Sequence, residues 1–162
     1  MEKWRKLYNS DKKCFACGEE NPCGIYLEFE TNGKIMKGET VISPHHRGWA
    51  SLVHGGVIST ILDETMSWAA IYFFKKFILT QSMEIEFLKP VYIEKKVKSS
   101  GWIHEQISEK KAIMSSEIYN EDNEVCARAT GKFVLFEPEK FKKLNIVPNS
   151  LLEEIEGMFN LE

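Results

Sequence analysis

No long hydrophobic run is present in this sequence. Its longest uninterrupted apolar stretch, residues 69–74, is far shorter than the roughly 20 residues that a membrane-spanning helix needs. The charged N-terminal residues are followed by no apolar segment, so they do not match the pattern of a secretory signal peptide. We therefore expect a cytoplasmic protein with no membrane partner.

A strong excess of charge of one sign is also missing. Lys and Arg together number 21 against 24 Asp and Glu, which gives a net charge of −3. No basic run stands out locally, and a basic patch is the electrostatic footprint of a protein that binds nucleic acid. We expect no nucleic-acid partner.

Cysteine is too scarce for a disulfide framework. The chain has Cys14, Cys17, Cys23 and Cys126, and it is long enough to build a hydrophobic core without bridges. Free thiols are therefore the expectation. Because C-x-x-C is half of a zinc site, Cys14 and Cys17 raise the alternative of a bound metal, with Cys23 as its third ligand.

A complete ligand set for such a metal is not evident. No fourth ligand follows at a usual spacing, apart from the pair His45 and His46, which we expect to be solvated loop residues. A thioredoxin-like redox role is disfavoured because no βαβ pattern surrounds the cysteines. Packing of an N-terminal loop is the favoured interpretation, and we predict neither a metal nor a cofactor.

One strong helix is predicted over residues 52–74. Its apolar residues recur at spacings of three and four, and this stripe is wide enough to indicate an enclosed helix. Two β-like segments precede the helix and four follow it. The expected strands are 25–30, 34–42, 78–87, 91–108, 112–120 and 124–136.

This order of elements predicts an α+β protein in which an antiparallel sheet wraps around one helix. A single sheet leaves edge strands open, which favours self-association. We expect one domain over residues 1–137 and a tail of one or two short helices over residues 138–162.

The stretch V-H-G-G-V-I-S-T-I-L-D-E, residues 53–64, contains the most informative chemistry. Its glycine pair can bring backbone N–H groups to a helix N-terminus, where negative charge is stabilised. Asp63 and Glu64 follow about two turns later, within an otherwise apolar run, where a carboxylate is costly unless it is paired or used. An oxyanion site and a carboxylate on one helix are the minimum equipment for splitting an ester or thioester.

Three motifs together resemble the hotdog-fold acyl-CoA thioesterases, in the branch of the phenylacetic-acid-degradation (PaaI-like) enzymes. They are C-F-A-C-G-E-E-N-P-C-G-I near the N-terminus, R-G-W-A-S-L-V-H-G-G-V-I-S-T-I-L-D-E at the helix, and T-Q-S-M-E-I-E-F-L-K-P after it. The resemblance implies a sheet of about six strands around a central helix. It also implies a homodimer, often paired into a tetramer, that binds its acyl-CoA substrate at the dimer interface.

The resemblance assigns catalytic roles to four residues. Asp63 stands at the place of the catalytic carboxylate, acting either as general base or as nucleophile. Gly55 stands at the oxyanion position, where its N–H would bind the thioester oxygen. His54 would position the loop or the substrate, and Thr80 would hold Asp63 or the attacking water.

Four further residues are candidates for substrate binding. Gly56 could share the oxyanion role, and Glu64 is expected at the pocket rim or in a structural pair. Trp49 is a candidate because many relatives carry Asn where Gly48 stands, and the pair Gly48-Trp49 instead resembles a sub-branch with Gly-Trp at this place. Lys89 stands where Arg is common before a proline, so it would contact phosphate as a point charge.

Two other functions stay open at this stage. The first is a non-catalytic acyl-CoA-binding or sensing module of the same fold, although the presence of Asp63 argues against it. The second is a hydratase-type hotdog enzyme acting on enoyl thioesters. Such enzymes pair an aspartate with a nearby histidine, whereas His54 precedes Asp63 by nine residues.

Overall fold

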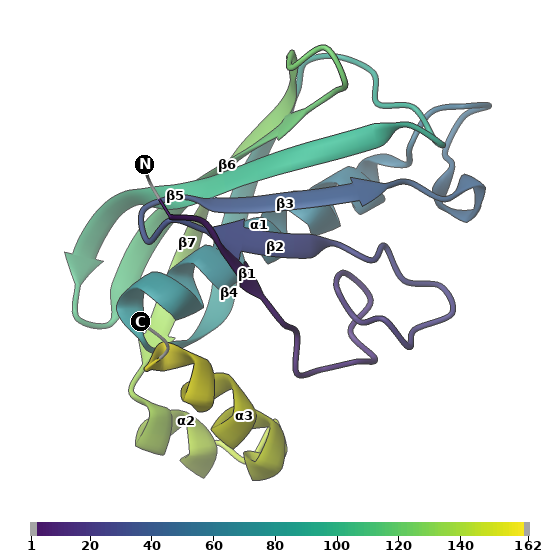
Figure 1. Cartoon of the computed structure of the whole chain (residues 1–162). Helices are drawn as coiled ribbons and strands as arrows, with labels where there is room; N and C mark the ends of the chain where they lie inside the picture. Colours follow the sequence, from purple (N-terminus) through teal and green to yellow (C-terminus); the bar gives the residue numbers. More distant parts are fainter. Residues whose placement is uncertain (1–2, 161–162) are drawn as a thin grey trace.

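One long helix, α1 (Gly55–Phe74), packs against an antiparallel sheet that wraps around it (Figure 1). The computed structural model describes residues 3–160. The seven strands are arranged in the order β1-β2-β3-β5-β6-β7-β4. Their bounds are β1 Arg5–Leu7, β2 Glu28–Thr31, β3 Met36–Val41, β4 Phe77–Phe87, β5 Lys96–Ser108, β6 Lys111–Tyr119 and β7 Val125–Phe136.

The α+β prediction is confirmed, with one strand more than the six expected from sequence. The extra strand is β1, which precedes the first segment that we expected to form a strand. Arg5 pairs with Thr31 and Leu7 with Phe29, so β1 extends the sheet beyond β2. Its three residues are too few to show a period, and only the open edge of β2 makes them a strand.

Two strands begin later than their apolar sequences predict. The backbone N–H groups of Ile25 and Leu27 donate to carbonyls of the N-terminal loop, at Phe15 and Ala16, instead of to a neighbouring strand. Residues 91–95 likewise pair with the loop before α1, where the Val91 carbonyl accepts the Val53 N–H at 2.8 Å. The apolar residues Ile25, Leu27 and Val91 are therefore buried against loops, and not within the sheet.

The central helix begins at Gly55, three residues later than predicted, because His54 caps it. It ends where Lys75 adopts a left-handed backbone with φ of 54°. No helix in the described part of the chain is long and apolar enough to cross a membrane. The buried side chains of α1 are Val57, Ile58, Ile61, Leu62, Thr65, Met66, Trp68, Ala69 and Ala70.

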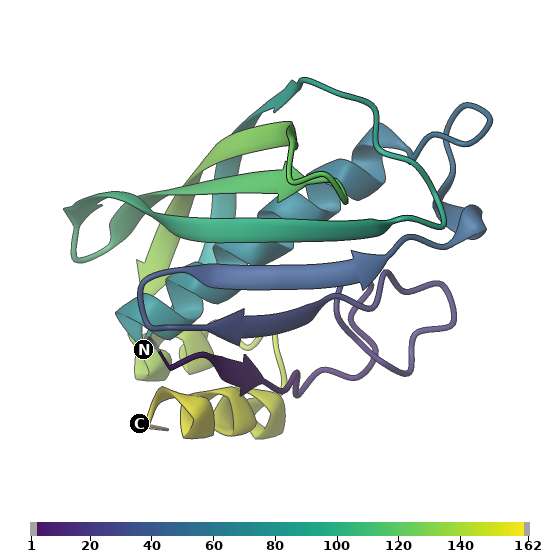
Figure 2. The same ribbon diagram turned by 45° about the horizontal axis from the view of Figure 1, so that its top comes forward.

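Two short helices, α2 (Pro138–Lys143) and α3 (Asn149–Phe159), follow the last strand and pack together at one end of the sheet (Figures 1 and 2). Phe141 of α2 and Leu152 of α3 enclose Phe77, the first residue of β4. This small second cluster covers the start of β4. Among residues 3–160, the rest of β4 pairs only with β7, which leaves its other edge open.

Candidate active site

The N-terminus of α1 presents a single unoccupied backbone donor at its first residue. His54 has an extended backbone, and its Nδ1 accepts the Gly56 N–H at 2.9 Å. The Gly55 N–H has no hydrogen-bond acceptor within residues 3–160. Because the first N–H groups of a helix have no intrahelical partner and the helix dipole favours negative charge there, Gly55 is suited to binding a carbonyl oxygen that becomes an oxyanion.

The structure therefore separates the roles of the two glycines. Gly56, predicted as an alternative oxyanion donor, has its N–H engaged by His54, whereas Gly55 does not. His54 acts as the cap, with Nδ1 as the acceptor, and its own N–H donates to the His46 carbonyl at 3.0 Å. The nearest side chain to a methyl group at Gly55 would be the ring of Phe87, at 3.6 Å.

Asp63 and Thr80 are in direct contact although 17 residues separate them. Thr80 Oγ1 donates to Asp63 Oδ1 at 2.8 Å. Burial raises the pKa of the Asp63 carboxyl, and the Thr80 hydrogen bond opposes this shift only in part. Thr80 is well placed because β4 carries an irregularity between Thr80 and Ser82 in its pairing with β7. Such bulges re-aim side chains and are common beside active sites.

Gly55 and Asp63 cannot act on one carbonyl within a single chain. Eight helical residues separate them, and a rise of about 1.5 Å per residue places them about 12 Å apart along the axis of α1. We call these two separated groups, the Asp63 carboxylate and the free N–H of Gly55, half-sites. Both lie on the side of α1 that borders β4, since Thr80 and Phe87 of that strand flank them.

Glu64 points about 100° around α1 from Asp63, toward the N-terminal loop. Its Oε1 lies 2.8 Å from Cys17 Sγ and 3.7 Å from Cys14 Sγ, and it accepts the indole N–H of Trp68 at 3.0 Å. The residue keeps some solvent exposure, but desolvation of the carboxyl group dominates and raises its pKa to about 7. Sequence reasoning anticipated a structural pair for Glu64 but missed these partners; the only available signal was the i, i+4 spacing to Trp68.

The two sulfur atoms lie 3.6 Å apart and titrate as a pair. The hydrogen bond from Cys17 is the main cause that lowers the pKa of Cys14 to about 6, and the same hydrogen bond raises the pKa of Cys17.

Our expectations for the other cysteine and histidine residues need correction. Cys23 is exposed and is not among the grouped ligand atoms of Cys14, Cys17 and Glu64. His46 is buried, not solvated, and its Nε2 lies 2.7 Å from the Cys23 carbonyl. The cause is that the N-terminal loop folds over the short 3-10 helix η1 (Pro44–His46), which a local pattern does not reveal.

Trp49 and Lys89, the remaining predicted substrate contacts, lie at the surface. The Trp49 side chain is 86% exposed, beside a left-handed Ala50 with φ of 48°. Lys89 forms an exposed ion pair with Glu124 at 2.5 Å. Trp49 and Lys89 are therefore available to contact a substrate only where it extends over the surface of the protein.

Known proteins show the same architecture. Residues 50–127 match the family model described as Thioesterase superfamily. The rat acyl-coenzyme A thioesterase THEM4 is 29% identical over 97 residues, which cover 59% of this chain and 41% of the relative. The chain thus matches less than half the length of that curated relative.

Two solved structures extend the comparison to the fold. The PaaI protein from the phenylacetic acid degradation operon of E. coli has a TM-score of 0.65 at 15% identity, covering 74% of this chain and 87% of PaaI. A hypothetical thioesterase from Streptococcus pneumoniae, solved with coenzyme A, has a TM-score of 0.59 at 18% identity, covering 63% of this chain and 81% of the other. The family model matches residues 50–127, just under half of the chain, so the chain is similar to the Thioesterase superfamily, and the solved structures show that it has the hotdog fold.

Proposed function

We propose that the protein is an acyl-CoA thioesterase that hydrolyses its substrate to a free acid and CoA. The observation that carries the proposal is the pair of half-sites on α1, namely the Asp63 carboxylate held by Thr80 and the free N–H of Gly55. The names of the rat relative and of the coenzyme A complex from Streptococcus support the choice of substrate class.

The chemistry follows from these two groups. Asp63 takes a proton from a water molecule that attacks the thioester carbonyl, or attacks the carbonyl itself to form a mixed anhydride that water then splits. The Gly55 N–H and the helix dipole stabilise the oxyanion that develops. The C–S bond breaks, and CoA leaves as a thiolate that recovers the proton. Because a thiolate is a good leaving group, no histidine acid is required.

We infer that a second copy of the chain completes the site. The separation of about 12 Å between Gly55 and Asp63 requires that the glycine facing one aspartate come from another subunit. The open edge of β4, next to both half-sites, supports a homodimer formed by this strand. In that assembly, Lys89 and Trp49 are our candidates for contacts to CoA.

An enoyl-CoA hydratase is a weaker candidate. Such an enzyme needs a histidine beside the aspartate. His54 instead lies at the N-terminus of α1, nine residues before Asp63, where its Nδ1 accepts the Gly56 N–H. A hydratase assay with an enoyl-CoA still belongs in the test, because addition of water to the double bond is seen as loss of ultraviolet absorbance without thiol release.

The experiment that tests the function is CoA-thiol release from a panel of short, medium, long and phenylacetyl thioesters, with binding measured in parallel by calorimetry. Turnover of at least one thioester supports the proposal and names the acyl class. Binding of acyl-CoA without release of thiol from any panel member would contradict it and indicate a non-catalytic binding module.

Replacing Thr80 with valine is expected to lower kcat by about tenfold and leave KM nearly unchanged. The substitution removes the hydrogen bond to Asp63 while keeping the shape of the side chain, and hydrogen bonds to charged groups contribute about 1.5–3 kcal/mol. Steady-state kinetics provide the measurement, and Thr80→Ser, which keeps the hydroxyl, is the matched control. Equal rates for the two variants would show that the hydroxyl does not position Asp63.

A further inference from the structure

We propose that Cys14, Cys17 and Glu64 form a binding site for one thiophilic divalent cation, with zinc as the natural occupant. This inference is independent of the thioesterase proposal, because Glu64 points about 100° around α1 from Asp63, toward the N-terminal loop and away from β4. It assigns a role to three residues that the proposed reaction does not use. It also revises our expectation from sequence that the cysteine loop merely packs and that no metal is bound.

The first argument is that the cysteine loop has the geometry of a metal-binding knuckle. Cys14 and Cys17 are separated by two residues, which is the usual spacing of cysteine ligands for zinc. Gly18 closes the turn, and its N–H donates to the Cys14 carbonyl at 2.9 Å.

This turn tolerates only glycine at position 18. A Cβ atom there would lie 2.5 Å from the backbone nitrogen of Cys14 and from the backbone oxygen of Lys12. Backbone atoms cannot yield as a flexible side chain does, so any other residue would open the turn and move the two sulfur atoms. The loop is therefore built to hold Cys14 and Cys17 side by side.

The three ligand atoms lie within 4.8 Å of one another. The two Sγ atoms are 3.6 Å apart, and Glu64 Oε1 lies 2.8 Å from Cys17 Sγ and 3.7 Å from Cys14 Sγ. Tetrahedral zinc with Zn–S bonds of about 2.3 Å requires two sulfur ligands at about 3.8 Å. The sulfur separation is near this value, and it is far longer than the bond of about 2.05 Å in a disulfide. The contact between Cys17 Sγ and Glu64 Oε1 would lengthen to about 3.5 Å when a metal replaces the thiol proton.

Charge supplies the second and independent argument. Glu64 forms no ion pair with any Lys, Arg or His in the part of the chain that the structure describes. Its partners are two thiols and an indole, although a desolvated carboxylate without a cation is costly. A divalent cation bound by two thiolates and this carboxylate would supply the missing positive charge and release the thiol protons.

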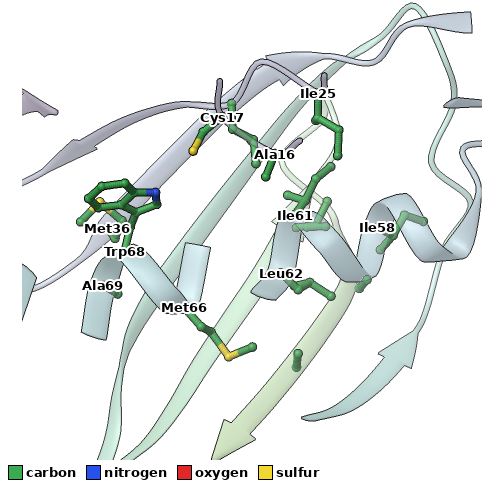
Figure 3. Close-up of a cluster of buried hydrophobic side chains, with 14 of the residues drawn as sticks. Ala16, Cys17, Ile25, Met36, Ile58, Ile61, Leu62, Met66, Trp68 and Ala69 are labelled. Carbon is green, nitrogen blue, oxygen red and sulfur yellow. The ribbon is translucent and has the colours of Figure 1, made fainter. Parts of the chain in front are cut away.

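The site has an outer shell and a route to solvent. Asn9 lies with its Nδ2 3.0 Å from Cys17 Sγ, and Trp68 hydrogen-bonds the carboxylate, as outer-shell groups do in metal sites. Figure 3 shows Cys17 on the loop above α1, with its sulfur on the side of Trp68. Both residues line a cavity of about 390 Å³. Through it a metal can enter, and water can take the fourth coordination position.

The consequence for the molecule is a clamp between the N-terminal loop and the central helix. Two ligands come from the loop and one from α1, one residue after Asp63. Bound metal would cross-link this part of α1 to the N-terminal loop. The cross-link would join Cys14 and Glu64, which are about 50 residues apart in the sequence. We therefore expect metal binding to raise the melting temperature of the protein.

The test is metal binding by the whole 162-residue chain, purified under reducing conditions and then stripped of metal. Zinc content is measured by mass spectrometry, and cobalt is titrated into the stripped protein to follow the thiolate-to-cobalt charge-transfer absorbance. We expect one equivalent per chain, saturating absorbance that zinc abolishes, and a higher melting temperature. Cys17→Ser should remove the absorbance, and Glu64→Gln, which keeps an acceptor for Trp68, should weaken binding at least about tenfold.

Cys23→Ser and Cys126→Ser are the matched controls, because both cysteines lie outside the cluster. They should bind cobalt as the unmodified protein does. The proposal fails if the reduced protein binds no stoichiometric cobalt or zinc, or if Cys23→Ser removes the site while Cys17→Ser does not. Recovery of a Cys14–Cys17 disulfide from reduced protein that binds no metal would overturn it in favour of a redox pair. No activity measurement enters the test, so failure of the thioesterase proposal leaves its outcome readable.

Discussion

Asp63→Asn is expected to lower kcat for thioester hydrolysis by at least about 100-fold, because an amide neither accepts a proton from water nor attacks a carbonyl. The asparagine keeps an oxygen that can accept the Thr80 hydroxyl, so the fold around the site should be preserved. The measurement is single-turnover and steady-state release of CoA thiol with the best substrate of the panel, together with the oligomeric state of the variant.

Asp122→Asn is the matched control, since it makes the same chemical change in an exposed hairpin. It should leave the rate unchanged. A wild-type rate in folded Asp63→Asn protein would remove Asp63 from the mechanism. Acyl-CoA binding is measured for both variants, because this distinguishes loss of the chemical step from loss of substrate binding.

Gly55→Pro is expected to lower kcat by about 100- to 1,000-fold, the usual loss when one oxyanion donor is removed. Proline suits the first position of a helix, where its missing N–H leaves no intrahelical hydrogen bond unmade. It also requires an extended residue before it, and His54 already has φ of −61° and ψ of 136°. The substitution therefore removes the proposed donor while sparing the helix.

Gly55→Ala provides the control for this substitution, because it keeps the N–H. Its methyl group would make ordinary van der Waals contact with Phe87 at 3.6 Å, so we expect a loss well below that of the proline variant. Circular dichroism and the melting temperature establish that both variants are folded. Equal, small losses for the two would show that the Gly55 N–H does not bind the oxyanion.

The two inactive variants together also test whether the site lies between subunits. When Asp63→Asn and Gly55→Pro chains are co-expressed with different tags, a mixed dimer contains one site with both defects and one with none. Random pairing into dimers with shared sites should restore about one quarter of the wild-type rate. Sites confined to single chains would show no recovery in the purified mixed dimer.

The sequence by itself determined the central element of the fold. The spacing of apolar residues over 52–74 depends only on the helical period, and it predicted α1 to within three residues at its start. The strands with clear patterns, such as β6 and β7, were found for the same reason. The glycine pair and Asp63 could also be singled out, since glycine at a helix start and a carboxylate in an apolar run are local anomalies.

Only the tertiary structure decided which side chains meet. The contact of Thr80 with Asp63, the placing of Cys14 and Cys17 on Glu64, and the burial of His46 all join segments far apart in the chain. A periodic pattern shows which face of an element is buried but not what covers it, and the N-terminal loop has no period at all. The position of this loop depends on its hydrogen bonds to η1 and to residues 25–27, just before β2. The partners of Glu64 are therefore known only once the loop is folded onto α1.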